Sequence, residues 1–262
     1  MRKITLIFLL CFFFSISANA GTDGENSLSK KNKPESVKDC FEKVNRGIFA
    51  FNQALDNTIF EPLARGYRHI PSPIRNGTGN ALGNLTNLVT VPNNILQGDL
   101  KAAGVNSLRF LVNTTVGILG IFDPAAAMGF EKKDKEDYGQ TFGRWGMGPG
   151  CYVVLPIFGP STVRDAAGTV VNFVGGDPWF NVTVANDTSY FNESDFYITR
   201  GTSGIDYRAK NIDSLESIEK NSIDFYASIR SLYLQDRQQK ILNSKKVTDT
   251  MDDSDWEEIE SK

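Results

Sequence analysis

The side chains most often used for catalysis and metal binding are few in this sequence and lie far apart. His69 is the only histidine. Cys40 and Cys151 occur singly rather than in a CxxC pair, and the third cysteine lies in an apolar N-terminal run. Since zinc sites are built from clustered cysteine and histidine, we expect no metal site. Two cysteines so far apart do not indicate a disulfide framework, and the spacing favours two unpaired thiols over a Cys40–Cys151 bond.

The glycine-rich segment 138–168 (YGQTFGRWGMGPGCYVVLPIFGPSTVRDAAG) is the next candidate for chemistry, because glycine-rich loops can bind phosphate. It lacks the GK[ST] of a P-loop, and Pro149 breaks the spacing of a dinucleotide-binding motif. Ser161 is outside a G-x-S-x-G motif, and Arg164-Asp165 is better explained as a local ion pair than as a catalytic pair. We therefore predict no catalytic residue, no cofactor and a protein that is not an enzyme.

The N-terminus has the pattern of a secretory signal peptide. Arg2 and Lys3 precede an apolar run over residues 4–16, and Ala18-Asn19-Ala20 matches a signal peptidase site. We therefore expect export, with residues 1–20 removed. No cysteine follows a lipobox-like run, so no lipid anchor is expected.

The rest of the chain is predicted to hold one folded domain between two polar ends. Residues 21–34 have the composition of a flexible tether, and residues 35–243 carry periodic apolar patterns. Residues 244–262 are acidic, which is typical of a disordered tail. The net charge of −3 argues against binding to nucleic acid, which favours a basic surface.

Helical spacing of apolar residues predicts a mostly α fold. One stripe starts the domain near residue 35 and runs to Ile59, and another spans residues 205–242. Asp99 is expected to cap a helix between them. The charged segment 131–137 (EKKDKED) is expected to be a surface loop, and residues 152–157 are the best candidate for a strand. The apolar face predicted for the last stripe consists of Ile212, Leu215, Ile218, Phe225, Ile229 and Leu232.

Residues 76–98 have no charged side chain, yet they do not form a plain transmembrane pattern. Glycines and several asparagines interrupt the apolar residues, and each buried amide would need a partner. Two interpretations remain. Residues 76–130 are either the interior of an all-helical globule, which composition alone favours, or a set of short helices in or beside a bilayer interface. The asparagines are Asn80, Asn84, Asn87, Asn93 and Asn94.

Four segments together resemble the MlaA (VacJ) family of outer-membrane phospholipid-transport lipoproteins. They begin VNRGIFAFNQALDN, VPNNILQGDL, DYGQTFGRWGMGPG and IDYRAKNIDSL, and they cover most of residues 36–243 in the family's order. The third segment is the most specific, since it contains the pattern YGQT-GxWGxGxGxYxVLPxxGPSTxRD. The family's mature chain usually begins with a lipid-bearing cysteine, which we do not find here.

The resemblance implies an all-α protein whose amphipathic helices lie in the membrane plane as a ring around a central channel. It implies a location on the periplasmic side of the outer membrane. It also implies removal of mislocalised phospholipids from the outer leaflet, delivery to a periplasmic carrier of the MlaC type, and contact with porin trimers. On this interpretation the weakly charged residues 76–130 form in-plane membrane helices, with a wet channel on their polar side. The alternative function is a porin-associated structural protein of the envelope without lipid transfer.

The resemblance also suggests which residues serve the channel. Asn45, Arg46, Phe51 and Asn52 match a helix that packs near the channel and influences whether it is open. The stretch 138–150 matches one that helps line the channel and supports a flexible lip. Its candidate residues are Tyr138, Gln140, Trp145, Gly146, Gly148 and Gly150.

Overall fold

The structure is a computed structural model that describes residues 37–186 and 190–242. The chain divides into two units, residues 1–36 and residues 37–262, and the described residues all belong to the second. The predicted signal peptide (1–20), tether (21–34) and acidic tail (244–262) lie outside the described residues.

The described residues are mainly helical and contain one short two-stranded hairpin, in agreement with the predicted fold class. Segments labelled η are short π-helical turns. In chain order the elements are α2 (Glu42–Leu55), η2 (Asp56–Phe60), α3 (Glu61–Arg68), α4 (Ser72–Leu96), α5 (Leu100–Thr115), α6 (Pro124–Ala127), α7 (Tyr138–Arg144), β1 (Tyr152–Leu155), β2 (Gly159–Thr162), α8 (Val163–Val171), η3 (Asn172–Gly176), α9 (Pro178–Phe180), η4 (Asn181–Ala185), α10 (Glu193–Asn221) and α11 (Phe225–Leu242).

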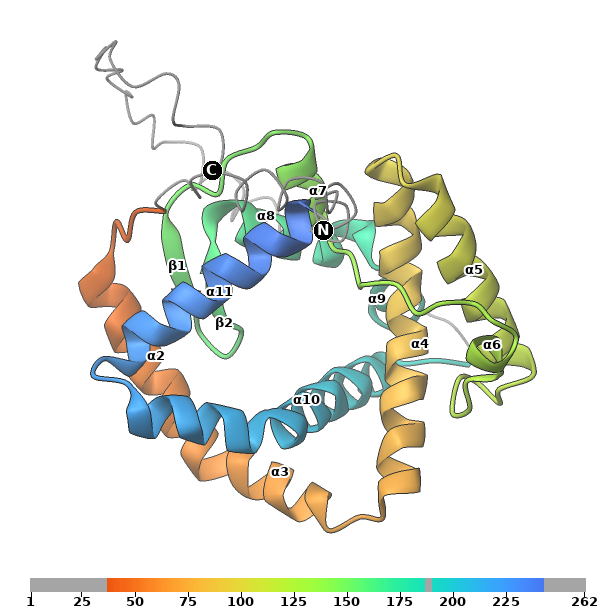
Figure 1. Ribbon diagram of the computed structural model, residues 1–262, viewed down its shortest axis with the longest axis horizontal. Helices are drawn as coiled ribbons and strands as arrows, with labels where there is room; N and C mark the ends of the chain where they lie inside the picture. The colour runs from red at the N-terminus through yellow and green to blue at the C-terminus, as the bar shows by residue number, and fades with distance from the viewer. Residues whose placement is uncertain (1–36, 187–189, 243–262) are drawn as a thin grey trace, which may run out of the picture. The chain divides into compact units, whose positions relative to one another are not determined.

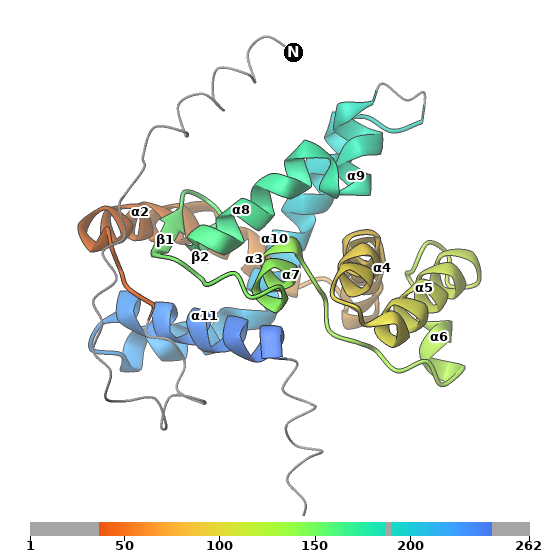
Figure 2. The same cartoon turned by 90° about the horizontal axis from the view of Figure 1, so that it is seen from above.

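The elements of this unit follow one another around a ring (Figure 1). α2, η2 and α3 make one arc, α4 continues it, and α7, α8 and the hairpin return to α2. α10 packs along α3 and reaches α4, while α11 contacts α7 and β2. Seen from above, α4, α5 and α6 lie at one end of the unit and α2 with the hairpin at the other (Figure 2). The predicted ring of helices is therefore confirmed.

The first arc begins with α2 at Glu42, later than the predicted start near residue 35. Pro62 falls in the first turn of α3, where a missing backbone N–H is tolerated, so it does not end the arc. Pro71 immediately precedes α4, and Pro73 lies in the first turn of α4. The chain therefore changes direction at these two prolines.

The buried apolar core is small, and many large apolar side chains are exposed. The turn after α5 is the clearest case, because nearly every large residue in it is exposed. A surface this apolar indicates contact with lipid or protein. The exposed residues of this turn are Val116, Ile118, Leu119, Ile121 and Phe122. The two core clusters are Ala64, Ala209 and Ile212 between α3 and α10, and Tyr152, Val154 and Tyr226 between the hairpin and α11.

Neutral amides hold α4 against α5. Asn84 Nδ2 donates to Thr114 Oγ1 at 2.8 Å, and Asn106 Nδ2 donates to Asn94 Oδ1 at 2.8 Å. All three asparagines are buried, so these bonds satisfy groups that would otherwise be costly to bury. Asn84 and Asn94 thus join α4 to α5.

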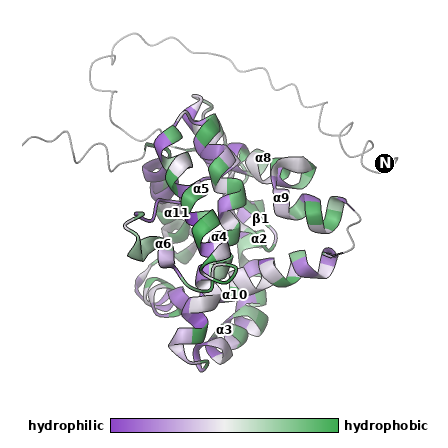
Figure 3. Cartoon of the chain, turned by 90° about the vertical axis from the view of Figure 1, so that its right-hand side faces the viewer, coloured by the Kyte–Doolittle hydropathy of each residue, from purple (hydrophilic) through white to green (hydrophobic). Residues whose placement is uncertain are grey.

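Hydrophobic and hydrophilic stretches alternate along α4 and α5 (Figure 3). Asp99 caps α5 as predicted, since its Oδ1 accepts from the backbone N–H of Ala102 at 2.9 Å. Among the helices that the structure describes, none is both long and apolar enough to cross a membrane.

Residues 131–137, which we call the strap, run from the α6 side across α4 to α7 as irregular chain. Glu136 is only 6% exposed and accepts from Gln97 Nε2 at 2.9 Å. Lys135 Nζ donates to the carbonyl oxygen of Gly83 at 2.8 Å. The prediction of a surface loop is therefore wrong for the second half of the strap, because polar groups of α4 and its C-terminal cap give these charges buried partners.

A disulfide bond joins the turn before α2 to the residue before β1. Cys40 and Cys151 are bonded, with Cα atoms 5.6 Å apart, so the prediction of two unpaired thiols is wrong. The two cysteines are 111 residues apart in the sequence, and the ring arrangement brings them together. Next to the bond, the backbone N–H of Tyr152 donates to the carbonyl oxygen of Lys38 at 2.9 Å.

Asn45 binds the edge of β1 that β2 does not occupy. Its Nδ2 donates to the Tyr152 carbonyl oxygen at 3.0 Å, and its Oδ1 accepts from the Val154 N–H at 2.9 Å. One side chain thus replaces a neighbouring strand and protects an edge that would otherwise be open.

The last two helices differ from the prediction in start and in orientation. α10 begins at Glu193 rather than near residue 205, because Asn192 and Asp195 form a capping box. The predicted apolar face is confirmed at Ile212, which is fully buried, and wrong at Leu232, which is 47% exposed. The side of α11 that meets the hairpin and α7 instead carries tyrosines and arginines at helical spacing. These are Tyr226, Arg230, Tyr233 and Arg237.

Candidate functional site

Two neighbouring cavities lie among the elements of the ring. Their volumes are about 210 Å³ and about 220 Å³. Asp137, at the end of the strap, and Asn172, directly after α8, line both of them. We call the first the α4 cavity and the second the hairpin cavity, and we treat them as one candidate site because they share these side chains.

The α4 cavity has an apolar wall and a polar wall. Leu82, Leu85 and Val89 of α4 form the apolar wall. Arg200 of α10 lies on the polar side and forms an ion pair with the buried Asp177, which in turn caps α9. The other polar residues that line it are Thr86, Lys135, Glu136, Asp137, Asn172, Thr199 and Ser203, and Trp179 completes it.

The hairpin cavity is divided in the same way. Leu155, Phe158 and Pro160 of the hairpin are apolar, and they face polar groups from α8 and α11. The polar residues are Asp137, Ser161, Asp165, Thr169, Asn172, Tyr233 and Arg237. Each cavity therefore offers apolar and polar surface side by side.

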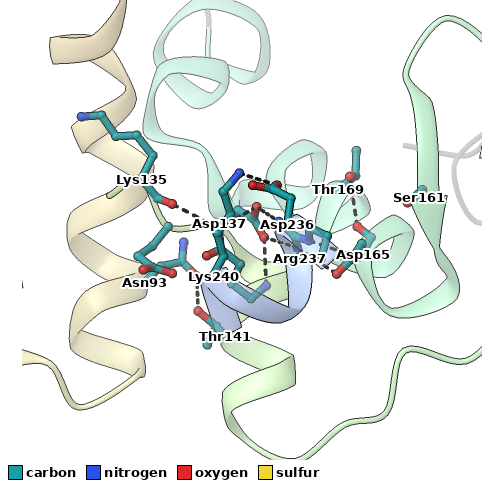
Figure 4. A network of polar contacts seen from close by, with 12 residues as sticks. Asn93, Lys135, Asp137, Thr141, Ser161, Asp165, Thr169, Asp236, Arg237 and Lys240 are labelled. Atoms are coloured by element: carbon teal, nitrogen blue, oxygen red, sulfur yellow. Dashed lines mark hydrogen bonds and ion pairs between the residues drawn. The ribbon is translucent and has the colours of Figure 1, made fainter. Parts of the chain in front are cut away.

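Arg237 of α11 links the two cavities through two carboxylates (Figure 4). It binds Asp137 with two bonds, Nη1 to Oδ2 at 2.6 Å and Nη2 to Oδ1 at 2.9 Å. Its Nη2 also donates to Asp165 Oδ1 at 2.8 Å. Asp165 further accepts from the hydroxyl of Tyr233 at 2.6 Å and from Arg164 Nε at 3.0 Å. We call this set the Arg237 node.

Two glycines allow the carboxylates of the node to share one guanidinium. A Cβ on Gly168 of α8 would lie 2.3 Å from the backbone nitrogen of Gly139 in α7. A Cβ on Gly139 would lie 2.6 Å from Asp165 Oδ1. Since real Cβ atoms do not approach this closely, α7 and α8 can pack at this distance only with glycine at both positions.

The node keeps its carboxylates ionised. Burial opposes ionisation of Asp137, but the hydrogen bonds and charge of Arg237 outweigh it and lower the pKa of Asp137 to about 2. Burial likewise opposes ionisation of Asp165, and Arg237 again lowers its pKa below the ordinary value. Burial, followed by the charge of Asp165, raises the pKa of Tyr233, which keeps its hydroxyl protonated as a donor.

The site suits reversible binding of an amphipathic molecule. Asn172 Oδ1 is buried and has no hydrogen-bond partner among the described residues, so it can accept from a bound group. Ser161 lies in the hairpin cavity, but its hydroxyl donates to the Thr162 carbonyl oxygen at 3.2 Å, and the sole histidine is at the end of α3. Within the described residues, no cluster of histidine, cysteine and carboxylate side chains could hold a metal ion.

The candidate residues predicted on α2 lie outside both cavities. Asn45 binds β1 as described above, and Asn52 continues this contact by donating to the Leu155 carbonyl oxygen at 2.9 Å. Arg46 pairs with Asp224 before α11 and stacks over a tyrosine ring at 4.3 Å. Phe51 is exposed. The two asparagines thus hold the hairpin that supplies the apolar wall of the hairpin cavity.

The candidate residues predicted in 138–150 lie near the site but do not line it. Gln140 is buried and donates to Asp137 Oδ2 at 3.0 Å, and the Tyr138 hydroxyl donates to the Gly176 carbonyl oxygen at 2.7 Å. Trp145 is exposed and bonds to the carbonyl oxygen of Leu96. Gly146 and Gly150 have positive φ, and with Gly148 they form the turn before β1. None of these residues lines either cavity.

The central residue of the node, Arg237, was not found from the sequence. A usable signal was present in α11, where Tyr226, Arg230, Tyr233 and Arg237 recur every three or four residues. Such a polar stripe on a helix that also has apolar residues indicates a polar buried face.

The chain is similar to proteins of known family. Residues 37–240 match the family described as MlaA lipoprotein. The intermembrane phospholipid transport system lipoprotein MlaA of Haemophilus influenzae is 29% identical over 259 residues, 94% of each chain. The Escherichia coli protein of that name is 31% identical over 224 residues, covering 83% of this chain and 80% of that one. A structure solved as "Structural basis for maintenance of bacterial outer membrane lipid asymmetry" matches with a TM-score of 0.67 and 29% identity, covering 78% of this chain and 99% of that one.

Proposed function

The chain belongs to the MlaA lipoprotein family, and we propose that it removes mislocalised phospholipids from the outer leaflet of an outer membrane. The lipid would pass through the α4 and hairpin cavities to the periplasmic side, where a soluble carrier of the MlaC type receives it. The activity would maintain lipid asymmetry, in keeping with the names of the relatives and the matched structure.

The observation that carries this proposal is the division of each cavity into an apolar and a polar side. A phospholipid has acyl chains and a charged headgroup, so its path must satisfy both parts. Leu82, Leu85 and Val89 offer apolar surface, while Arg200 and Asn172 offer polar groups opposite. The charged groups that line the cavities are largely paired with each other, which favours weak contacts from which a headgroup can leave.

The exposed apolar residues support a position in the inner leaflet of that membrane. The turn after α5 and the helices α2 and α5 expose many large apolar side chains. A helix that lies in one leaflet needs this kind of outer surface. We propose a porin trimer as the neighbour of this surface within the membrane.

The residues predicted on α2 have a defined part in this proposal. Asn45 and Asn52 hold the hairpin against α2, and the hairpin supplies Leu155 and Phe158 to the hairpin cavity. Loss of these amide contacts would let the hairpin move and change the width of the path. Their influence on channel opening remains a prediction.

Filling the α4 cavity tests the proposal. Ser203 of α10 lines this cavity, and Ser203→Trp would place an indole in a volume of about 210 Å³. We expect cells that lack their own family member and carry this variant to accumulate outer-leaflet phospholipid. The measurement is labelling of intact cells with an amine reagent that cannot cross the membrane.

Ser214→Trp is the matched control, because Ser214 is an exposed serine on the same helix. It should leave the labelling at the wild-type level. Full clearance by a folded Ser203→Trp protein would contradict the proposed path. If loss of the whole protein leaves the outer leaflet free of phospholipid, a structural role beside porins becomes the better explanation.

A further inference from the structure

A third, smaller cavity lies between α4, α5 and the strap. Its volume is about 30 Å³. Apart from Lys135, which also lines the α4 cavity, its residues are not those of the central site. Cationic and amide side chains dominate it, so we call it the basic cavity. Its lining includes Asn84, Arg109, Asp123, Lys132, Lys133 and Lys135.

The basic cavity has more positive than negative charge. Its single lining carboxylate, Asp123, is bound by Arg109 at 2.7 Å, and Lys133 is paired with Glu131 of the strap. Lys135 Nζ donates to two uncharged oxygens, those of the Gly83 carbonyl and the Asn87 side chain. Lys132 is exposed and has no carboxylate partner among the described residues. Two cations therefore remain without a counter-charge.

The excess charge affects Lys135 directly. Burial, followed by repulsion from Lys132 and Arg109, lowers the pKa of Lys135 to about 8. An anion placed between these cations would relieve the repulsion and stabilise the charged form of Lys135.

An unpaired amide provides an independent indication of a ligand. Asn84 is 6% exposed, and its Oδ1 is buried without a partner among the described residues. Its Nδ2 bonds to Thr114 Oγ1. If the amide turns over, the Thr114 hydroxyl can donate to Oδ1, and Nδ2 then presents an N–H donor at the position that now lacks a partner.

We propose that the basic cavity binds a phosphate group, with one phosphate oxygen inside it and the remaining oxygens held by Lys132 and Lys135. The volume supports this arrangement, since about 10–15 Å³ is needed for one water-sized group and a whole phosphate would not fit. Lysine ammonium groups and amide N–H groups are common ligands of phosphate oxygens. The chemistry is shared by a phospholipid headgroup and by free phosphate.

Binding of two soluble probes to the purified full chain tests the site and distinguishes these sources. The probes are inorganic phosphate and glycerophosphoglycerol, a headgroup without acyl chains, titrated calorimetrically in detergent without chloride. Lys132→Gln should weaken binding about tenfold, as expected for loss of one charged hydrogen bond. Lys132→Arg should retain it. Lys101→Gln is the matched control, because Lys101 is an exposed lysine of α5 that does not line the cavity, and it should bind as the wild type does.

Tighter binding of glycerophosphoglycerol would identify a lipid headgroup as the ligand, and tighter binding of inorganic phosphate would identify free phosphate. Either result supports the site. The proposal is overturned if Lys132→Gln binds as well as the wild type, if neither probe binds at millimolar concentration, or if chloride displaces phosphate at equal concentration. Since Ser203→Trp tests the central cavities in cells, the two proposals can fail separately.

Discussion

The α4–α5 pair and the Arg237 node bury polar groups in two different ways. Between α4 and α5 the buried groups are mainly neutral amides, such as Asn94 with Asn106. At the node the buried polar groups are a guanidinium and two carboxylates, which pair with each other beside two cavities. Neutral amides cost less to remove from water than ions, so they suit an apolar setting. Ions suit the cavity walls, where a polar ligand can pass.

Removing the shared cation should have the largest effect. Arg237→Met would leave Asp137 and Asp165 close together without their main partner. We expect the free energy of unfolding to fall by about 3–5 kcal/mol, the usual cost of breaking a buried ionic network. Urea unfolding in detergent measures it.

Lys240→Met on the same helix is the control, since Lys240 pairs with Asp236 at the surface. Its effect should stay below about 1 kcal/mol. Equal effects of the two substitutions would show that the node is not a structural centre.

Breaking one amide pair should have a smaller effect that a second substitution reverses. Asn106→Leu leaves Asn94 Oδ1 buried without its donor, which should cost about 1–3 kcal/mol. Asn94→Leu combined with Asn106→Leu removes both polar groups and should recover much of that loss. Urea unfolding measures the stability of both proteins, and a double variant no more stable than Asn106→Leu alone would contradict this account of the pair.

Acid should weaken the node and leave the amides unchanged. The pKa of Asp137 is about 2 in the folded protein against 3.8 ordinarily, so its contribution is complete above the ordinary value. It is lost as the pH falls from near 4 towards 2. Because the side chain is partly exposed, we expect a loss of only about 1 kcal/mol. Unfolding at pH 6 and at low pH measures it, and Arg237→Met should abolish most of the difference.

The fold could be predicted from local signals wherever those signals were decisive. Prolines at 71 and 73 marked the end of the first arc, and Asp99 marked the start of α5. The capping box at Asn192 is also a local signal, and it could have predicted the start of α10. The Cys40–Cys151 bond could not be predicted locally, because it depends on the ring bringing α2 back to the hairpin.

The site was harder to predict because its residues come from distant elements. Asp137, Asp165 and Arg237 belong to the strap, α8 and α11, and each has an ordinary local explanation by itself. The resemblance directed attention to Asn45 and Asn52, which the structure connects to the hairpin. The residues of the node could not be recognised without the packing of α7 on α8, and this packing depends on Gly139 and Gly168.

The disulfide bond also makes residues 40–151 a covalently closed loop that contains α2 to α7 and the strap. A single cut by a protease anywhere inside this loop, for example beside the exposed Lys132, would leave the two fragments joined. A cut between Cys151 and α8 would instead separate α8 to α11 from the rest of the backbone. The part of the molecule with Lys132 and the apolar turn after α5 is therefore the part that stays covalently joined after a single cut.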